Sequence, residues 1–156
     1  TVLTIDFDAL QQANAFQSLF ELRGILEVQA AALAARRRSD EDLQAMKDAL
    51  ATMQAAPYGS VMWLKTDLQF HKTVAAATGN VYMLQFLTFV SEKVRESILA
   101  SGNQRGSEDL AAVTLGEHQC ILDAIETRNE AEAQEAMRAH LHGAASRVGL
   151  AEEQSD

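Results

Sequence analysis

Asp67 and His71 place a carboxylate and an imidazole on the inward side of a stretch with a helical pattern. The apolar stripe of this stretch runs through Leu64, Leu68 and Val74. The pair is four residues apart, and residues at that spacing are neighbours on one face of an α-helix. Burying either group without a partner costs free energy, so their inward position implies that they bind a partner.

Two further histidines take inward positions on two other stretches with helical periodicity. His118 lies four residues after Thr114 and three before Ile121. His140 lies three residues after Met137, on a stripe that the pattern assigns to the core. Three of the four histidines therefore face inward, each from a different expected helix.

These side chains are of the types that a divalent transition metal prefers. One carboxylate and three imidazoles that converge inside a bundle would bind one such ion, and facing helices of bundles do build sites of this kind. Any one histidine could instead be a hydrogen-bonded core residue, and Asp67 with His71 could be a simple ion pair. Both interpretations stay open here, because spacing does not fix which helix faces meet.

The elements that must position these residues are helices. The 156 residues are 47% hydrophobic and 22% charged, with one proline, and abundant Ala, Leu, Glu and Gln favour helix. Six segments show helical periodicity, at about 16–38, 40–56, 60–78, 81–100, 107–127 and 130–150. Short connections between them predict an all-α fold, an antiparallel bundle. We expect one helical domain at 16–150, an arm or short helix at 1–15 and a polar tail at 151–156.

Local signals mark the ends of these helices. Ser39, with Asp42 three residues later, forms an approximate capping box. Pro57 and Gly59 break the second segment, and Gly79 suits the left-handed conformation that ends the third.

Apolar periodicity also predicts which side chains fill the core. Leu22 and Val113 belong to the inward stripes of their segments, and Met62 is expected as core filler. Cys120 is expected as a small core residue and not as a nucleophile, because it lies in mid-helix among apolar groups.

Composition excludes several classes of function. The formal charge of -9 argues that this chain does not by itself bind DNA, since neutralising phosphates requires a basic face. No apolar run of about 18 residues predicts a membrane helix, and no signal peptide opens the sequence. A single cysteine excludes an internal disulfide framework and fits a reducing, cytoplasmic compartment. The motifs of phosphate-binding loops, zinc proteases, di-iron bundles and serine hydrolases are absent.

Five sequence motifs, in this order, resemble those of one protein family. They are Glu21-Leu22-Arg23-x-x-Leu26-Glu27, Asp67-x-x-Phe70-His71, Gly79-Asn80, Glu117-His118-x-x-Ile121 and Ala133-x-x-x-Met137-x-x-His140. Together they are similar to the FCD domain, the C-terminal effector-binding domain of FadR-type regulators in the GntR family of bacterial transcription factors. The resemblance covers about residues 16–148 and implies an antiparallel bundle of about six to seven helices.

The resemblance also implies a ligand set and an effector. The residues that would bind one divalent metal ion are Asp67, His71, His118 and His140. Zinc is the first choice for that ion, with nickel, manganese and iron as alternatives. The effector would be a small organic acid whose carboxylate reaches the metal, bound by Arg23 and Asn80, with Arg95 as a weaker candidate. Arg105 and Arg147 are candidates with similarly weak placement. Arg23 lies beside Leu19, Leu26 and Ala30 and so points toward the core or its edge, where pairing with an acid is the structural alternative. For any one of these arginines taken alone, a solvated helix face is the plain alternative.

A ligand sensor, and not an enzyme, is the function that the resemblance implies. Family members are usually homodimers that bind DNA through an N-terminal winged helix-turn-helix, and no basic recognition helix precedes Phe16. The first residue is Thr and not Met, so the chain can be a fragment, and DNA binding would belong to another part of the protein. Two alternatives remain, a metal-dependent hydrolase and a metal-free helical interaction domain. A hydrolase would need a general base near the metal, and the sequence offers none in a suitable position. Glu117 points about 100° away from His118 in an ideal helix.

Overall fold

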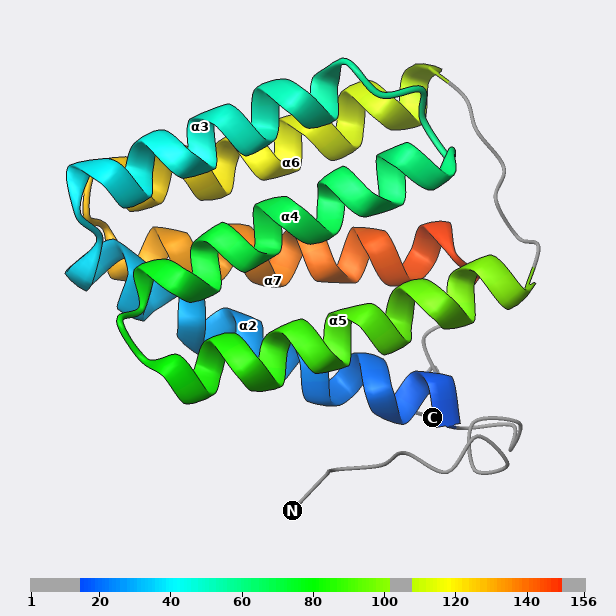
Figure 1. Cartoon of the computed structure of the whole chain (residues 1–156), viewed down its shortest axis with the longest axis horizontal. Coiled ribbons are helices and arrows are strands. Elements are labelled where there is room, and N and C mark those ends of the chain that lie inside the picture. The colour runs from blue at the N-terminus through cyan, green and yellow to red at the C-terminus, as the bar shows by residue number, and fades with distance from the viewer. Residues whose placement is uncertain (1–14, 102–107, 150–156) are drawn as a thin grey trace.

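The computed structural model describes residues 15–101 and 108–149, and these residues form an all-helical bundle (Figure 1). The helices are α2 (Ala15–Arg37), α3 (Asp40–Gln54), α4 (Val61–Ala77), α5 (Val81–Ser101), α6 (Glu108–Glu126) and α7 (Glu130–Arg147). Successive helices run in opposite directions (Figure 1), so the predicted antiparallel all-α fold is confirmed. None of these helices, within the ranges just given, is long and apolar enough to cross a membrane. The predicted tail at 151–156 and the predicted arm, except for Ala15, lie outside the described residues.

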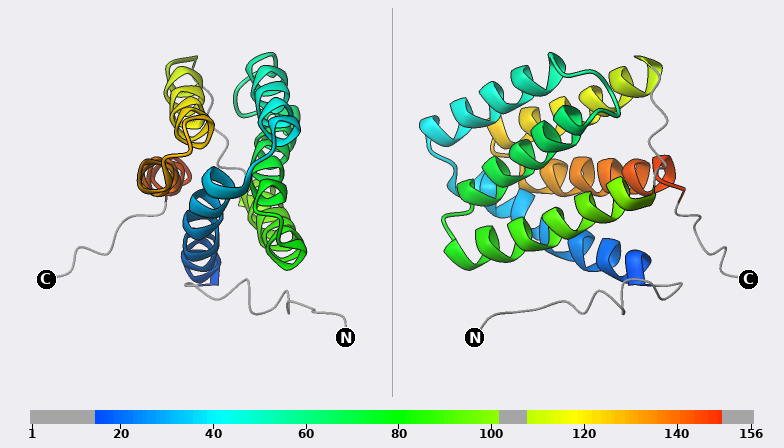
Figure 2. Two further views of the ribbon diagram at one scale, coloured as in Figure 1. Left: turned by 90° about the vertical axis from the view of Figure 1, so that its left-hand side faces the viewer. Right: turned by 45° about the vertical axis from the view of Figure 1, so that its right-hand side comes forward.

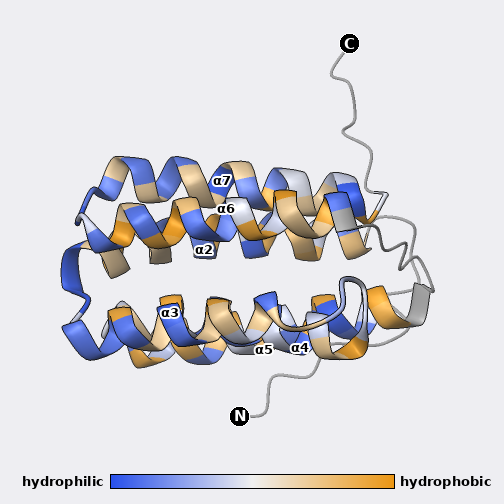
Figure 3. Cartoon of the chain, turned by 90° about the horizontal axis from the view of Figure 1, so that it is seen from above, coloured by the Kyte–Doolittle hydropathy of each residue, from blue (hydrophilic) through white to orange (hydrophobic). Residues whose placement is uncertain are grey.

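The helices form two layers that face each other across the core. One layer contains α2, α6 and α7, and the other contains α3, α4 and α5 (Figure 3). In the end-on view of Figure 2, α2 lies between α7 and α5. It packs against α6 and α7 in its own layer and against α4 and α5 in the other. The inward faces of α4, α6 and α7 therefore border a common interior beside α2.

Side-chain caps and one glycine fix where the helices begin and end. Ser39 and Asp42 form the predicted capping box at the start of α3. The Ser60 hydroxyl accepts a hydrogen bond from the backbone N–H of Trp63 at the start of α4. Gly79 has a φ of 66°, the left-handed conformation predicted after this helix. All helix ends agree with the predicted ones to within about three residues, and α4 contains both Asp67 and His71 as predicted.

The main core combines small side chains on α2 with larger ones on its neighbours. Ala31, Ala34 and Ala35 are each 0% exposed, and their small volume allows adjacent helices to approach α2 closely. Phe70 of α4 and Ile121 of α6 fill the space between the layers in the same cluster. This packing holds α4 and α6, which carry three of the candidate ligands, in fixed positions.

Four residues predicted for the core lie at the surface, so these predictions were wrong. Leu22 is 46% exposed, Met62 and Val113 are each 53% exposed, and Cys120 is exposed as well. The inward face of α2 includes Arg23, as its place beside Leu19, Leu26 and Ala30 predicts, and Leu22 directly before it points away from that face. Met62 and Val113 each directly precede a buried residue and lie about 100° from it around the helix. Cys120 is two positions beyond a buried histidine, a rotation of about 200° that points it outward.

Candidate metal centre

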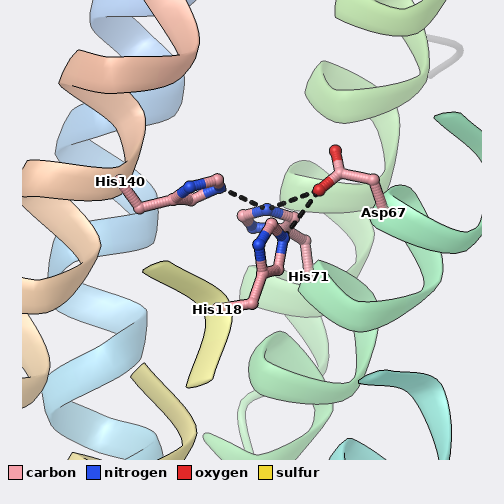
Figure 4. Close-up of side chains that lie close together, drawn as sticks. All are labelled: Asp67, His71, His118 and His140. Atoms are coloured by element: carbon pink, nitrogen blue, oxygen red, sulfur yellow. Dashed lines mark hydrogen bonds and ion pairs between the residues drawn. The ribbon is translucent and has the colours of Figure 1, made fainter. Parts of the chain in front are cut away.

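Three helices bring the four predicted ligands together (Figure 4). They are Asp67 and His71 from α4, His118 from α6 and His140 from α7. One possible ligand atom from each residue lies within 4.8 Å of the others. The three histidines are between 0% and 2% exposed, whereas the Asp67 side chain is 23% exposed. The fold thus supplies the convergence that spacing alone left open.

The atoms that face one another are the Oδ1 oxygen of Asp67 and the Nε2 nitrogens of the three imidazoles. Asp67 Oδ1 lies 2.7 Å from His118 Nε2 and 3.5 Å from His71 Nε2. The Nε2 atoms of His71 and His140 are 3.2 Å apart. All four are donor atoms of the kinds that bind a divalent transition metal.

Two of the imidazoles hold a carboxylate at their other nitrogen. His71 Nδ1 donates to Glu27 Oε1 at 2.5 Å, and His140 Nδ1 donates to Glu117 Oε1 at 2.8 Å. A carboxylate at Nδ1 fixes the orientation of the ring and makes Nε2 a stronger ligand. Both rings therefore present Nε2 to the centre of the cluster.

His118 has a backbone partner instead, and its contacts show what the site requires. His118 Nδ1 donates to the carbonyl oxygen of Thr114 at 2.7 Å, since a carbonyl can only accept. In a neutral imidazole Nε2 is then an acceptor, yet it faces the Asp67 oxygen, also an acceptor, at 2.7 Å. Two acceptors at this distance need a cation, either a second proton or a metal ion. The donor set therefore fits a divalent metal.

Burial and ionic partners oppose each other at the inner carboxylates. Burial alone would raise the pKa of Glu27, but the charges of Arg23 and His71 outweigh burial and lower this pKa to about 2. Burial likewise acts to raise the pKa of Asp67, but His71 and His118 hold it well below its usual range. Both carboxylates are therefore anionic at neutral pH, as metal binding and its support require.

The imidazoles of His71 and His140 respond to burial differently. Burial acts to lower the pKa of His71, but the carboxylates of Glu27 and Asp67 raise it to about 9. The pKa of His140 falls to about 3, first because of burial and then because of charge on His118. Among the protein groups alone, a proton is therefore held on His71, and His140 stays neutral.

Glu117 is kept ionised by two residues of α7. Burial alone would raise its pKa, but hydrogen bonds from His140 and Arg147 lower it to about 2. Arg147 Nη2 donates to Glu117 Oε1 at 2.6 Å, and Nη1 donates to Oε2 at 3.1 Å. The carboxylate that orients His140 is thus itself held by a two-point contact with an arginine.

A cavity of about 80 Å³ adjoins the cluster. Its polar lining consists of Arg23, Asp67, Thr114, His140 and Arg147. Its apolar walls consist of Phe20, Tyr58, Trp63, Leu64, Ile98, Ala144 and Val148. Pockets for drug-sized ligands have volumes of about 300–1,000 Å³, so this cavity can hold only a small molecule.

Of the three predicted effector residues, the structure places Arg23 at the cavity but not Asn80 or Arg95. Arg23 lines the cavity. Asn80 is exposed, and its Oδ1 accepts hydrogen bonds from the backbone N–H groups of Tyr82 and Met83, so it caps α5. Arg95 does not line the cavity, and its Nε is buried without a hydrogen-bond partner among the described residues. Of the weaker candidates, Arg147 lines the cavity, and Arg105 lies outside the described residues.

Sequence reasoning missed the two glutamates that support the cluster. Glu27 lies four residues after Arg23 on α2, and Arg23 Nε is 2.7 Å from Glu27 Oε2; that spacing was a usable signal. Glu117 was set aside because it points away from His118. The same rotation turns Glu117 toward α7, where it meets His140, and only the packing of α6 on α7 could reveal this.

The FCD domain matches residues 18–143, and the chain belongs to that family. A solved structure named Streptococcus agalactiae GntR superposes with a TM-score of 0.72 and 26% sequence identity, covering 92% of this chain and 62% of that one. The resemblance inferred from the sequence motifs is confirmed.

Curated relatives point to the same class of protein. The HTH-type transcriptional regulator LutR of Bacillus subtilis (strain 168) is 30% identical over 134 residues, which are 85% of this chain and 61% of LutR. The HTH-type transcriptional repressor NanR of Enterobacter sp. (strain 638) is 25% identical over 142 residues, 86% of this chain and 52% of NanR. The chain thus spans between half and two thirds of the length of these regulators.

Proposed function

We propose that this chain is the metal-containing, ligand-sensing domain of a transcriptional regulator. The proposed ligands of one divalent ion are Asp67, His71, His118 and His140. Zinc is the first choice, and nickel, manganese and iron also accept imidazole and carboxylate ligands. The observation that carries the proposal is the convergence of three Nε2 nitrogens and one carboxylate oxygen (Figure 4). Each imidazole also has its Nδ1–H on a separate acceptor, as metal-binding histidines commonly do.

The proposed effector is a small organic acid bound in the cavity beside the metal. Arg23 and Arg147 line this cavity together with the ligands Asp67 and His140. A guanidinium binds a carboxylate through paired hydrogen bonds, and a metal ion adds a second positive anchor where the dielectric constant is low. A volume of about 80 Å³ is well below the roughly 300–1,000 Å³ of pockets for drug-sized ligands, which favours a small acid.

Neither Asn80 nor Arg95 is part of the effector site that we propose. Asn80 is engaged at the start of α5, and Arg95 does not line the cavity. The metal serves in this proposal as a charge anchor and not as a catalyst. The carboxylates next to the ligands, Glu27 and Glu117, are each held by a histidine and an arginine, so neither is available as a general base.

DNA binding is proposed for a separate part of an intact homodimeric regulator. The curated relatives are named as HTH-type regulators and are longer than this chain. The effector would shift the bundle between two arrangements and so change the relative position of the attached DNA-binding parts. By linkage, it can do so only to the extent that its affinity differs between these arrangements.

The first test is metal content and metal affinity in protein purified without a histidine tag. We expect about one divalent ion per chain by elemental analysis, and tight binding of Zn²⁺ or Ni²⁺ to the stripped protein by calorimetry. His118→Ala should abolish this binding while the circular dichroism spectrum stays helical. Gln119→Ala, an exposed neighbour on the same helix, is the matched control and should bind metal normally.

Two results would contradict the proposal. One is an absence of metal in several preparations together with no binding on titration. The other is undiminished metal affinity in the His118→Ala variant. Either result would favour a helical interaction domain whose histidines are only buried and hydrogen-bonded.

A further inference from the structure

We infer that Glu117, Arg147 and Gly143 form a positioning unit that holds His140 in its metal-binding orientation. This inference rests on the proposed function, because it concerns a ligand of the proposed metal. It adds a glycine and an ion pair, neither of which would touch the metal, to the residues that determine metal affinity.

Glu117 joins two residues of α7 that lie on one face of that helix. His140 and Arg147 are seven residues apart, about two helical turns. Glu117 Oε1 accepts from His140 Nδ1 at 2.8 Å and from Arg147 Nη2 at 2.6 Å. One oxygen of a carboxylate on α6 is therefore shared by the ring of a candidate ligand and a guanidinium.

Gly143 lies between those two residues, in the turn over which the carboxylate rests. A Cβ at position 143 would lie 2.7 Å from Glu117 Oε2 and 2.9 Å from Arg147 Nη1. Both distances are too short for non-bonded atoms, so this glycine leaves the space that the ion pair occupies. Because the two atoms are the ends of flexible side chains, an alanine there would displace the pair and leave the helices in place.

Displacing the pair should change the metal site through His140 alone. The Glu117 carboxylate would shift away from His140 Nδ1 and no longer fix the ring. Loss of such partners of metal-binding histidines typically weakens metal affinity about 10- to 100-fold. A glycine that serves only to let two helices pack would affect folding but would not alter the coordination of a bound ion.

The test compares two glycine-to-alanine substitutions in the metal-stripped and reloaded protein. Gly143→Ala should weaken Zn²⁺ binding about 10- to 100-fold and change the visible absorption spectrum of the Co²⁺-loaded protein. Gly116→Ala is the matched control, since nothing outside its chain neighbours and its own helix backbone lies within 4 Å of its added Cβ and it directly precedes Glu117. This control should keep the Zn²⁺ affinity within about twofold and leave the Co²⁺ spectrum unchanged. Alanine favours helix over glycine, so both variants should remain helical by circular dichroism.

A second variant makes the result independent of how Gly143→Ala folds. Glu117→Gln preserves shape but removes the charge that holds both α7 residues, and it should also weaken Zn²⁺ binding about 10- to 100-fold. Combined with Gly143→Ala it should cost little more than either change alone, because both act through the same contact. Wild-type affinity and an unchanged Co²⁺ spectrum in Gly143→Ala and Glu117→Gln would overturn the inference. If the wild-type protein itself binds no metal, the proposed function fails first, and the inference fails with it.

Discussion

Two groups of arginine, glutamate and histidine support the candidate metal centre, and they differ in construction. The α2 triad consists of Arg23, Glu27 and His71. The α7 triad consists of Arg147, Glu117 and His140. The arginine and glutamate of the α2 triad share one helix and are 6% and 2% exposed. Those of the α7 triad lie on different helices and are 13% and 20% exposed.

The difference shows two ways to keep a carboxylate ionised beside a buried histidine of the candidate metal centre. In both triads the pKa of the glutamate is lowered to about 2 against the effect of burial. In the α2 triad the pairing of arginine with glutamate is set by spacing within one helix, and only the histidine comes from another helix, α4. The α7 triad exists only when α6 and α7 pack together and when Gly143 leaves room for it. We call the first a fixed support, because its ion pair lies within one helix, and the second an adjustable support, because its ion pair joins two helices.

The largest predicted effect is a loss of protein stability when the α2 triad is broken. Arg23→Met in the metal-free protein leaves the buried Glu27 without its arginine, and we expect a loss of about 3–5 kcal/mol in the free energy of unfolding. Urea denaturation measures it. Arg36→Met is the control, because the pair of Arg36 with Glu130 is exposed and should contribute less than about 1 kcal/mol. Equal losses in the two variants would show that burial does not set the strength of the α2 triad.

The corresponding change in the α7 triad should cost less. Arg147→Met removes a two-point contact that water partly reaches, and we expect a loss of about 1–3 kcal/mol in the same urea experiment. Glu117 keeps its hydrogen bond from His140 and gains access to solvent. A loss as large as that of Arg23→Met would contradict the distinction between a fixed and an adjustable support.

A third prediction concerns the metal and not the fold. Glu27→Gln should weaken Zn²⁺ binding about 10- to 100-fold, or about 1.4–2.8 kcal/mol, because His71 loses the carboxylate that orients it. Competition with a chromophoric chelator measures this affinity. Glu21→Gln, an exposed position on the same helix, should change it by less than about twofold. If Glu27→Gln matches wild type, the α2 triad supports only the fold.

Much of the fold could be predicted from the sequence, because helix periodicity and caps are local. Ser39 with Asp42 and the left-handed Gly79 were both predicted and are present. The errors arose where a helix carries charge on its inward side. Arg23, which its place beside Leu19 and Ala30 predicts toward the core, is buried on α2 together with Glu27. Leu22, predicted for the same stripe, is exposed.

The inward positions of the candidate ligands could be predicted as well, but not the groups that surround them. The inward phase of His118 and His140 follows from residues three and four positions away. Whether the two rings meet depends on the rotation of α6 against α7, which no local pattern records. The same holds for Glu117, whose partner is on the neighbouring helix. Long-range contacts between charged side chains were therefore the part that required the structure.

The smallest predicted effect is on acetate affinity, and it distinguishes the contribution of Arg147 from that of Arg23. Arg147 gives both terminal nitrogens to Glu117, whereas Arg23 contacts Glu27 through Nε. An acid in the cavity must therefore share Arg147 with Glu117, so Arg147→Lys should weaken acetate binding to the Co²⁺-loaded protein by only about two- to fivefold. Arg23→Lys should weaken it more, and Arg138→Lys, on the exposed side of α7, should have no effect. A spectroscopic acetate titration in which Arg147→Lys is the more damaging change would show that the adjustable triad, and not the fixed one, holds the effector.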